Sequence, residues 1–204
     1  MKVRRLSFFI VWLAFILYAF VLAPNGNQGY LNQLITMNDP DPLLLTVFSL
    51  LGVFPTAFAI LLLNEDDSRV PAWPFVLGSF MLGAFALMPY FFISRAESTR
   101  TLRTPIWIGK SLDSILFKAL LFTGTVALIV SGLTQGSASL YGQAFRQSQF
   151  VHVMTIDFLV LTGISMFVIY WRERKHGRFN QMYWLGCVPV VGFLAYLLIK
   201  EGSH

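Results

Sequence analysis

The chain has 204 residues, of which 56% are hydrophobic and only 12% are charged. A soluble domain carries about 25% charged residues, so this composition excludes an ordinary soluble protein and indicates a membrane protein. The net charge of +5 comes from short basic clusters beside apolar runs, which favours topology signals or contacts with the lipid bilayer over a nucleic-acid surface. The single cysteine, Cys187, excludes an intrachain disulfide framework.

Six apolar segments follow one another along the chain, each close to the roughly 20 residues that a helix needs to cross a bilayer. They are Leu6–Ala23, Leu43–Leu63, Ala72–Ile93, Leu112–Thr134, Phe150–Trp171 and Met182–Ile199. Each is expected to be helical, because the hydrocarbon core offers no water to unpaired backbone groups. The sequence therefore predicts one all-α domain over residues 1–204, a polytopic membrane protein built as a bundle of six transmembrane helices.

Three of these segments contain an interior proline, at Pro55, Pro89 and Pro189. An interior proline removes a backbone donor and kinks a helix, so we expect kinks at these positions. In the third segment, Ser79 and Gly83 form a small-xxx-small pair that allows another element to approach closely. No internal repeat is recognised. No pair of short or broken segments is recognised in the two halves either, which counts against a transporter.

The basic residues give conflicting signals about orientation in the membrane. With three spans between them, the N-terminal cluster and the basic segment 94–111 are expected on opposite sides. The basic residues of 94–111 and 172–178 then narrowly outnumber those on the other side. Because cytoplasmic loops carry the excess of Lys and Arg, this count places those two segments in the cytoplasm and both termini on the opposite side.

Four ionisable groups lie in or beside the predicted spans: Asp113 and Lys118 on the fourth, His152 and Asp157 on the fifth. An ionisable group at lipid depth is costly and indicates a functional site. At about 1.5 Å rise per residue, Lys118 and Asp157 differ in depth by roughly 15 Å, so we do not expect them to pair. We expect Lys118 to extend to its own nearer surface and Asp113 to be interfacial.

Asp157 is the deepest acid and the first candidate catalytic residue, with His152 as the second candidate. Five positions place the two about 140° apart around a helix, so they do not share a face. Asp157 either accepts hydrogen bonds from Ser, Thr or Tyr on a neighbouring helix, or serves as a proton relay, a catalytic acid or base, or a polar anchor for a ligand. No HxxxH, HExxH or CxxC pattern is present, so no metal site is predicted, and no cofactor is indicated.

Three motifs in the last third of the chain carry a resemblance to known proteins. They are the run from His152 to Phe158, the stretch Trp171–Lys175, and the segment Pro189–Leu198 with its Pro-x-x-Gly pattern. Over roughly residues 148–200 the chain resembles a group of small multi-span membrane proteins of unknown function from bacteria, cyanobacteria and chloroplasts. More distantly, it resembles the plant membrane proteins of neoxanthin synthesis. The resemblance implies a bacterial inner membrane or a thylakoid as the location, and a link to pigments or photosystem assembly.

Three functions stay open on these observations. The first is a small scaffold or assembly factor for other membrane proteins, favoured by the lack of a recognisable catalytic set. The second is an enzyme or binding protein for an apolar pigment, isoprenoid, carotenoid or lipid, with Asp157 as its acid or base. The third is a proton-coupled transporter that titrates Asp157. Tight packing beside Asp157 favours the first, an elongated apolar ligand the second, and a water-filled path the third.

Overall fold

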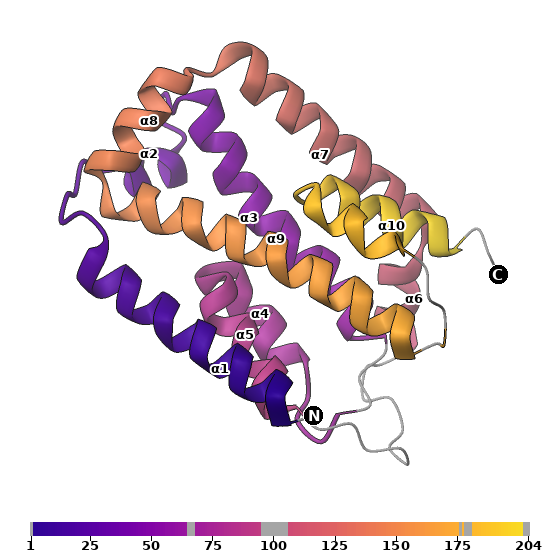
Figure 1. The fold of residues 1–204 in the computed structure, drawn as a ribbon. Coiled ribbons are helices and arrows are strands. Elements are labelled where there is room, and N and C mark those ends of the chain that lie inside the picture. Colours follow the sequence, from indigo (N-terminus) through magenta and orange to yellow (C-terminus); the bar gives the residue numbers. More distant parts are fainter. Residues whose placement is uncertain (1, 65–67, 95–105, 176, 178–180, 202–204) are drawn as a thin grey trace.

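The computed structural model describes residues 2–64, 68–94, 106–175, 177 and 181–201. Over these residues the chain is helical and forms no strands. Four helices are long and apolar enough to cross a membrane: Val3–Leu22, which comprises most of α1 and all of η1, α3 (Pro42–Leu62), α7 (Ile115–Gln135) and α9 (Gln149–Lys175) (Figure 1). The all-α prediction is confirmed, and these four helices are compatible with a membrane protein. Six transmembrane helices are not confirmed.

Short helices join the long ones into a single bundle. α1 (Lys2–Leu17) continues as the π-helical turn η1 (Tyr18–Leu22), and α2 (Tyr30–Thr36) leads into α3. α6 (Ile106–Asp113) precedes α7, and α8 (Ala138–Gln147) joins α7 to α9. The helices α2 and α8 lie at one end of the bundle and both termini lie at the other (Figure 1). We call these the α2–α8 end and the terminal end.

The third apolar segment forms two short helices rather than one long one, α4 (Trp73–Leu82) and α5 (Ala84–Ile93). The two helices pack side by side and run in opposite directions. Phe75, near the start of α4, faces Tyr90, near the end of α5, with ring centroids 5.8 Å apart. The segment is therefore a helical hairpin, and we call it the first hairpin.

The first hairpin turns at Gly83, whose φ of 52° and ψ of −129° are a conformation that glycine adopts far more readily than other residues. Pro89, where the sequence predicts a kink, lies inside α5, and the break between the two helices falls at Gly83, before it. The close approach predicted from the spacing of Ser79 and Gly83 is confirmed at the glycine: a Cβ there would collide with the carboxylate of Asp157.

The sixth apolar segment is broken in a similar way and forms the second hairpin. The 3₁₀ helix η2 (Gln181–Cys187) packs against α9, and α10 (Val191–Glu201) packs against η2 and α7. Val190, between the two arms, has a φ of 59° and follows Pro189, where the sequence predicts a kink within one helix. Both halves of the chain therefore contain a broken segment, contrary to the sequence prediction.

Both hairpins return to the terminal end of the bundle. Arg5, near the start of α1, donates a hydrogen bond of 2.8 Å to the carbonyl of Ser94, which follows α5. Tyr196 on α10 donates one of 2.6 Å to Glu173 near the end of α9. The N-terminal basic cluster and the beginning of segment 94–111 thus lie at the same end. The prediction that three spans separate them, from which the orientation conflict arose, was wrong.

The two halves of the chain share one architecture. α9 starts 107 residues after α3, α10 starts 107 residues after α5, and Val190 lies 107 residues after Gly83. The packing repeats as well: α5 packs on α1 as α10 packs on α7, and α4 packs on α3 as η2 packs on α9. α1 and α7 both run from the terminal end toward the α2–α8 end (Figure 1). The chain therefore contains two parallel copies of one unit.

Disulfide trapping tests the first hairpin in the Cys187→Ser background. A Cβ on Gly78 would lie 3.1 Å from the Cβ of Ala86, so a small outward shift would bring the pair to the separation of about 3.5–4.5 Å found in a disulfide. We expect the Gly78→Cys/Ala86→Cys pair to form an intramolecular disulfide on mild oxidation, measured by loss of maleimide labelling. In one continuous helix these positions would be about 12 Å apart and would not join.

The matched control for this trapping is the Thr123→Cys/Ser131→Cys pair, which has the same spacing within the continuous helix α7. We expect this pair to keep both thiols under the same oxidation. An equal loss of maleimide labelling in the two pairs would contradict the hairpin.

Candidate functional site

Asp157 lies on α9 with 6% of its surface exposed. One carboxylate oxygen accepts a hydrogen bond of 2.8 Å from the backbone N–H of Ala84, the first residue of α5. The first N–H groups of a helix have no partner inside it, and the helix dipole favours a negative charge there. Asp157 therefore caps the returning arm of the first hairpin from another helix. Its burial among helices agrees with the sequence prediction, but its partner is a backbone N–H rather than a hydroxyl.

A cavity of about 880 Å³ lies beside the tip of the first hairpin, with Asp157 in its wall. It is bounded by η1, α3, α4 and α9 and by the adjoining residues of α1, α2 and α5. Asp157 is the one ionisable side chain among the residues that line it, and most of the others are apolar. At its rim, Phe20 and Met81 are 78% and 90% exposed. The cavity therefore opens through an apolar rim to the outside of the bundle.

The cavity coincides with a difference in packing between the two halves. In the second half α7 packs closely on α3, where Thr46 donates to the carbonyl of Leu128 at 3.0 Å. In the first half the side chains of α1 and η1 contact α9 at two places along the bundle, with a gap between them. Phe8 meets Phe167 near the terminal end, with ring centroids 4.7 Å apart, and η1 meets α9 near the α2–α8 end. The space between α1 and α9 on the α2–α8 side of the Phe8–Phe167 contact is where the cavity lies.

His152 does not line the cavity. Its Nε2 accepts a hydrogen bond of 2.5 Å from the hydroxyl of Tyr18 in η1, and its Nδ1 lies 2.9 Å from the carbonyl of Phe145. Because a carbonyl only accepts, Nδ1 carries a proton, and in the neutral imidazole Nε2 then accepts from Tyr18. His152 thus ties η1 to α8 and α9, and it does not meet Asp157, consistent with their predicted separation around the helix. The two candidate catalytic residues are not brought together.

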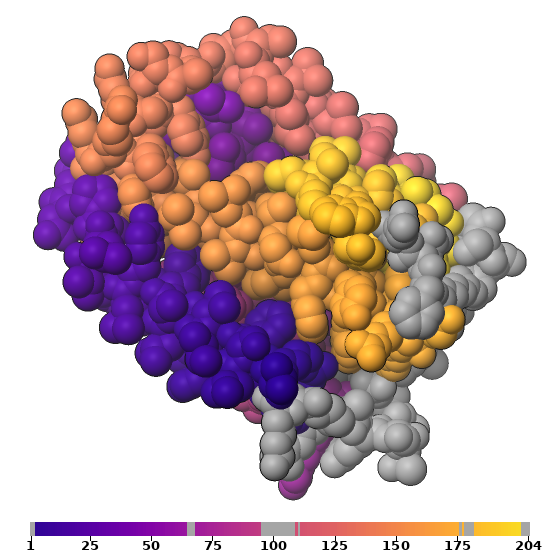
Figure 2. Space-filling view, viewed as in Figure 1, coloured from indigo at the N-terminus to yellow at the C-terminus, as the bar shows by residue number. Residues whose placement is uncertain are grey.

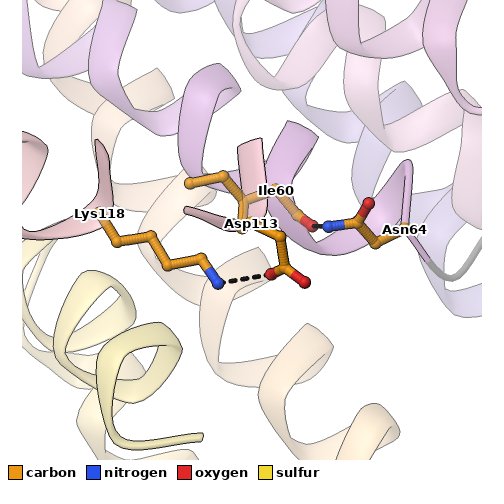
Figure 3. Close-up of polar contacts among 4 residues, drawn as sticks. All are labelled: Ile60, Asn64, Asp113 and Lys118. Atoms are coloured by element: carbon orange, nitrogen blue, oxygen red, sulfur yellow. Dashed lines mark hydrogen bonds and ion pairs between the residues drawn. The ribbon is translucent and has the colours of Figure 1, made fainter. Parts of the chain in front are cut away.

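Lys118 forms an ion pair with Asp113, with Nζ and Oδ1 2.5 Å apart (Figure 3). Lys118 is 3% exposed, whereas the side chain of Asp113 is 60% exposed. Beside this pair, Asn64 after α3 donates a hydrogen bond to the carbonyl of Ile60. Lys118 thus extends toward the surface nearer to it, as predicted, and not toward Asp157.

Glu173 is a second buried acid, whose role the sequence analysis missed because it stands within a basic stretch. It accepts the hydrogen bond from Tyr196 and forms an ion pair of 2.8 Å with Lys200. These contacts join the end of α9 to α10 at the terminal end. In the sequence, Glu173 is an acid between basic residues, a pattern that is also typical of a solvent-exposed turn.

In the described ranges, no group of three or more His, Cys, Asp or Glu side chains could hold a metal ion. Comparison with protein-family models, with curated proteins and with solved structures finds no match to the chain. The resemblance of residues 148–200 to small membrane proteins, and the thylakoid location it implies, therefore gain no support and stay predictions.

Substitution of Gly83 tests the fit between the turn and Asp157. We expect Gly83→Ala to lower the free energy of unfolding by about 1–3 kcal/mol, because the residue has a positive φ and its Cβ would meet the carboxylate. Unfolding of the detergent-solubilised protein, followed by circular dichroism, measures the change. Gly124→Ala is the control, since a Cβ there meets nothing within 4 Å in helix α7. Equal stability of the two variants would show that the turn does not depend on glycine.

Proposed function

We propose that this chain is an integral membrane protein that binds one elongated, lipid-like molecule in the cavity at the first hairpin, with Asp157 holding the polar end. The observation that carries the proposal is a cavity of about 880 Å³ that has mainly apolar walls and a single carboxylate. Pockets for small molecules commonly measure about 300–1,000 Å³ and combine apolar walls with a few polar groups that orient the ligand.

In this proposal four helices cross the membrane, and the two hairpins enter it and return to the same side. A helix of 21 residues, such as α3 or α7, is about 31 Å long and matches a hydrocarbon core of about 30 Å. The arms of the first hairpin, 10 residues each, are about 15 Å long and reach the middle of the bilayer. Irregular backbone is tolerated there when protein surrounds it or when it lines a cavity.

The free acceptor on Asp157 sets the chemistry of the ligand's polar end. One oxygen is bonded to Ala84, and the other has no hydrogen-bond partner within the described part of the chain. A hydroxyl or amine at the end of a long apolar chain would donate to this oxygen. The apolar part would lie against side chains such as Phe48 and Phe80. Long-chain and isoprenoid alcohols, hydroxylated pigments and amine-bearing lipids meet this description.

The second copy of the unit shows that the architecture does not require an acid at this place. Leu50 on α3 lies 107 residues before Asp157 and is similarly buried, at 4% exposure. At the second hairpin, the N–H of Val191 is bonded to the carbonyl of Pro189 at 2.6 Å, so this turn uses no carboxylate. The presence of an acid in one copy alone supports a role for Asp157 in binding as well as in capping.

Transport of the same class of ligand is the second candidate function. Both halves carry a broken segment at corresponding positions, a feature typical of transporters built from repeats. A proton carrier would also need a polar path to Asp157, and the cavity walls are mainly apolar. The scaffold function stays a prediction, with tight packing at Asp157 as its expected sign, and the structure has a cavity there instead.

Photolabelling tests the role of Asp157. A long-chain alcohol with a diazirine in its chain is added to the protein in mild detergent, and labelled peptides are identified by mass spectrometry. We expect labelling of the cavity wall. We also expect Asp157→Asn to weaken binding about tenfold, because a hydrogen bond to a charged group contributes about 1.5 kcal/mol.

The asparagine oxygen still accepts from Ala84, so this variant keeps the cap of the hairpin. The control probe is the matching alkane without the hydroxyl, for which wild type and variant should have the same affinity. Equal affinity of the two proteins for the alcohol would contradict the role of Asp157.

Filling the cavity tests its role separately. Gly52 lines the cavity, and a Cβ there meets nothing within 4 Å, so the backbone leaves room for a side chain to start and Gly52→Leu should extend into the ligand's space. We expect it to abolish labelling by both probes. Gly163→Leu is the matched control, because Gly163 is also a helical glycine with open space around it but lies outside the cavity. Labelling of both variants at the wild-type level would exclude the cavity as the binding site.

A further inference from the structure

We infer that the terminal end of the bundle faces the cytoplasm and that the cavity takes its ligand sideways from the opposite leaflet. This inference rests on the proposed function for the identity of the site. It adds the side of the membrane and the lipid layer that supplies the ligand. Three observations carry it. They are the distribution of basic residues, the position of the cavity along the length of the bundle, and the contact of α1 with α9 between the cavity and the terminal end.

Basic residues gather at the terminal end. In the described part of the chain this end has Lys2, Arg4, Arg5, Arg69, Lys110, Lys118, Arg172, Arg174, Lys175 and Lys200, together with the acids Asp113, Glu173 and Glu201. The α2–α8 end has only Arg146 among the described residues, together with Asp39 and Asp41. Short cytoplasmic loops carry the excess of Lys and Arg in membrane proteins. Because both hairpins return to the terminal end, the N-terminal basic residues and the later ones lie on the same side of the bundle. The rule therefore places that end in the cytoplasm.

The cavity occupies the half of the bundle nearer to the α2–α8 end. Its inner limit is at Gly83 and Asp157, and its lining extends to Gln149, the first residue of α9, and to Met37 beyond α2. At 1.5 Å per residue, Asp157 is about 12 Å from the start of α9, whereas a span is about 30 Å long. With the terminal end in the cytoplasm, the cavity therefore lies at the level of the non-cytoplasmic leaflet.

Aromatic rings close the gap between α1 and α9 on the cytoplasmic side of the cavity. Phe8, Phe91 and Phe167 contact one another, with ring centroids 5.1, 4.7 and 5.8 Å apart. In the space-filling view, α1 and α9 lie next to each other on one face of the molecule (Figure 2). A long-chain molecule from the cytoplasmic leaflet would have to separate these rings. Entry from the other leaflet requires only passage over the exposed rim at Phe20 and Met81.

Two single-cysteine variants in the Cys187→Ser background test the orientation. Val3→Cys lies at the terminal end and Asn38→Cys at the α2–α8 end, and both native residues are exposed. In intact spheroplasts of an expressing bacterium, we expect a membrane-impermeant maleimide to label Asn38→Cys and to leave Val3→Cys unlabelled until lysis. The reverse pattern would overturn the inference. It would leave the proposed function untouched, because labelling of the cavity by the alcohol does not depend on the orientation.

Quenching by a nitroxide phospholipid tests the leaflet in reconstituted vesicles. The quencher is added from outside, so it enters only the outer leaflet. The fraction of Asn38→Cys open to the impermeant maleimide gives the fraction of molecules with their α2–α8 end outside. A fluorophore at Phe20→Cys, on the cavity rim, should lose this same fraction of its emission. The control Leu116→Cys, exposed near the terminal end of α7, should lose the complementary fraction.

If the Phe20→Cys fluorophore followed the complementary fraction instead, the cavity would open to the other leaflet and the inference would be overturned. If quenching followed the expected pattern while no long-chain alcohol labelled the cavity, the proposed function would fail, and the ligand source inferred here would fail with it. The two sets of measurements thus separate an error in the side of the membrane from an error in the site.

Discussion

The hydrogen bond from the backbone N–H of Ala84 to the carboxylate of Asp157 is the interaction on which the architecture of the site depends. In a lipid bilayer an unpaired backbone N–H and an unpaired carboxylate are each costly. Here the N–H of Ala84 and one oxygen of the carboxylate are partners of each other. Gly83 allows the chain to reverse next to the carboxylate, because it has no Cβ to occupy that space. The short hairpin can therefore end in the middle of the bundle, with one acid beside its tip and a cavity next to it.

The internal repeat explains how such a site arises without a separate binding domain. Two copies of the same unit pack along α3 and α9, and each copy closes its own hairpin against its own long helices. In the second copy the first helix, α7, also packs closely on α3. In the first copy, α1 and α9 stand apart between the ring of Phe8 and the α2–α8 end, which leaves space there. The hydrogen bond between Tyr18 and His152 joins the two helices at the far end of this space. A difference in helix packing between two similar units therefore creates the cavity.

Composition and depth were sufficient to predict the helical class, the burial of Asp157 and the direction in which Lys118 extends. They were insufficient for the hairpins, because an apolar run of about 20 residues has the same composition whether it crosses a bilayer or turns back within it. The turn at Gly83 depends on a single φ angle, and glycine is common in membrane helices. The repeat was hidden because the two copies share buried positions rather than residue types: Leu50 corresponds to Asp157. The cavity depends on a separation between helices that no local pattern encodes.

Electron density beside Asp157 in crystals grown from a lipid phase would test the central claim most directly. Our account predicts an elongated density that runs from the rim at Phe20 to the hairpin tip. Its polar end should lie about 2.7–3.2 Å from the carboxylate oxygen that Ala84 does not use. A cavity closed by side chains, or filled by ordered water, would contradict the account.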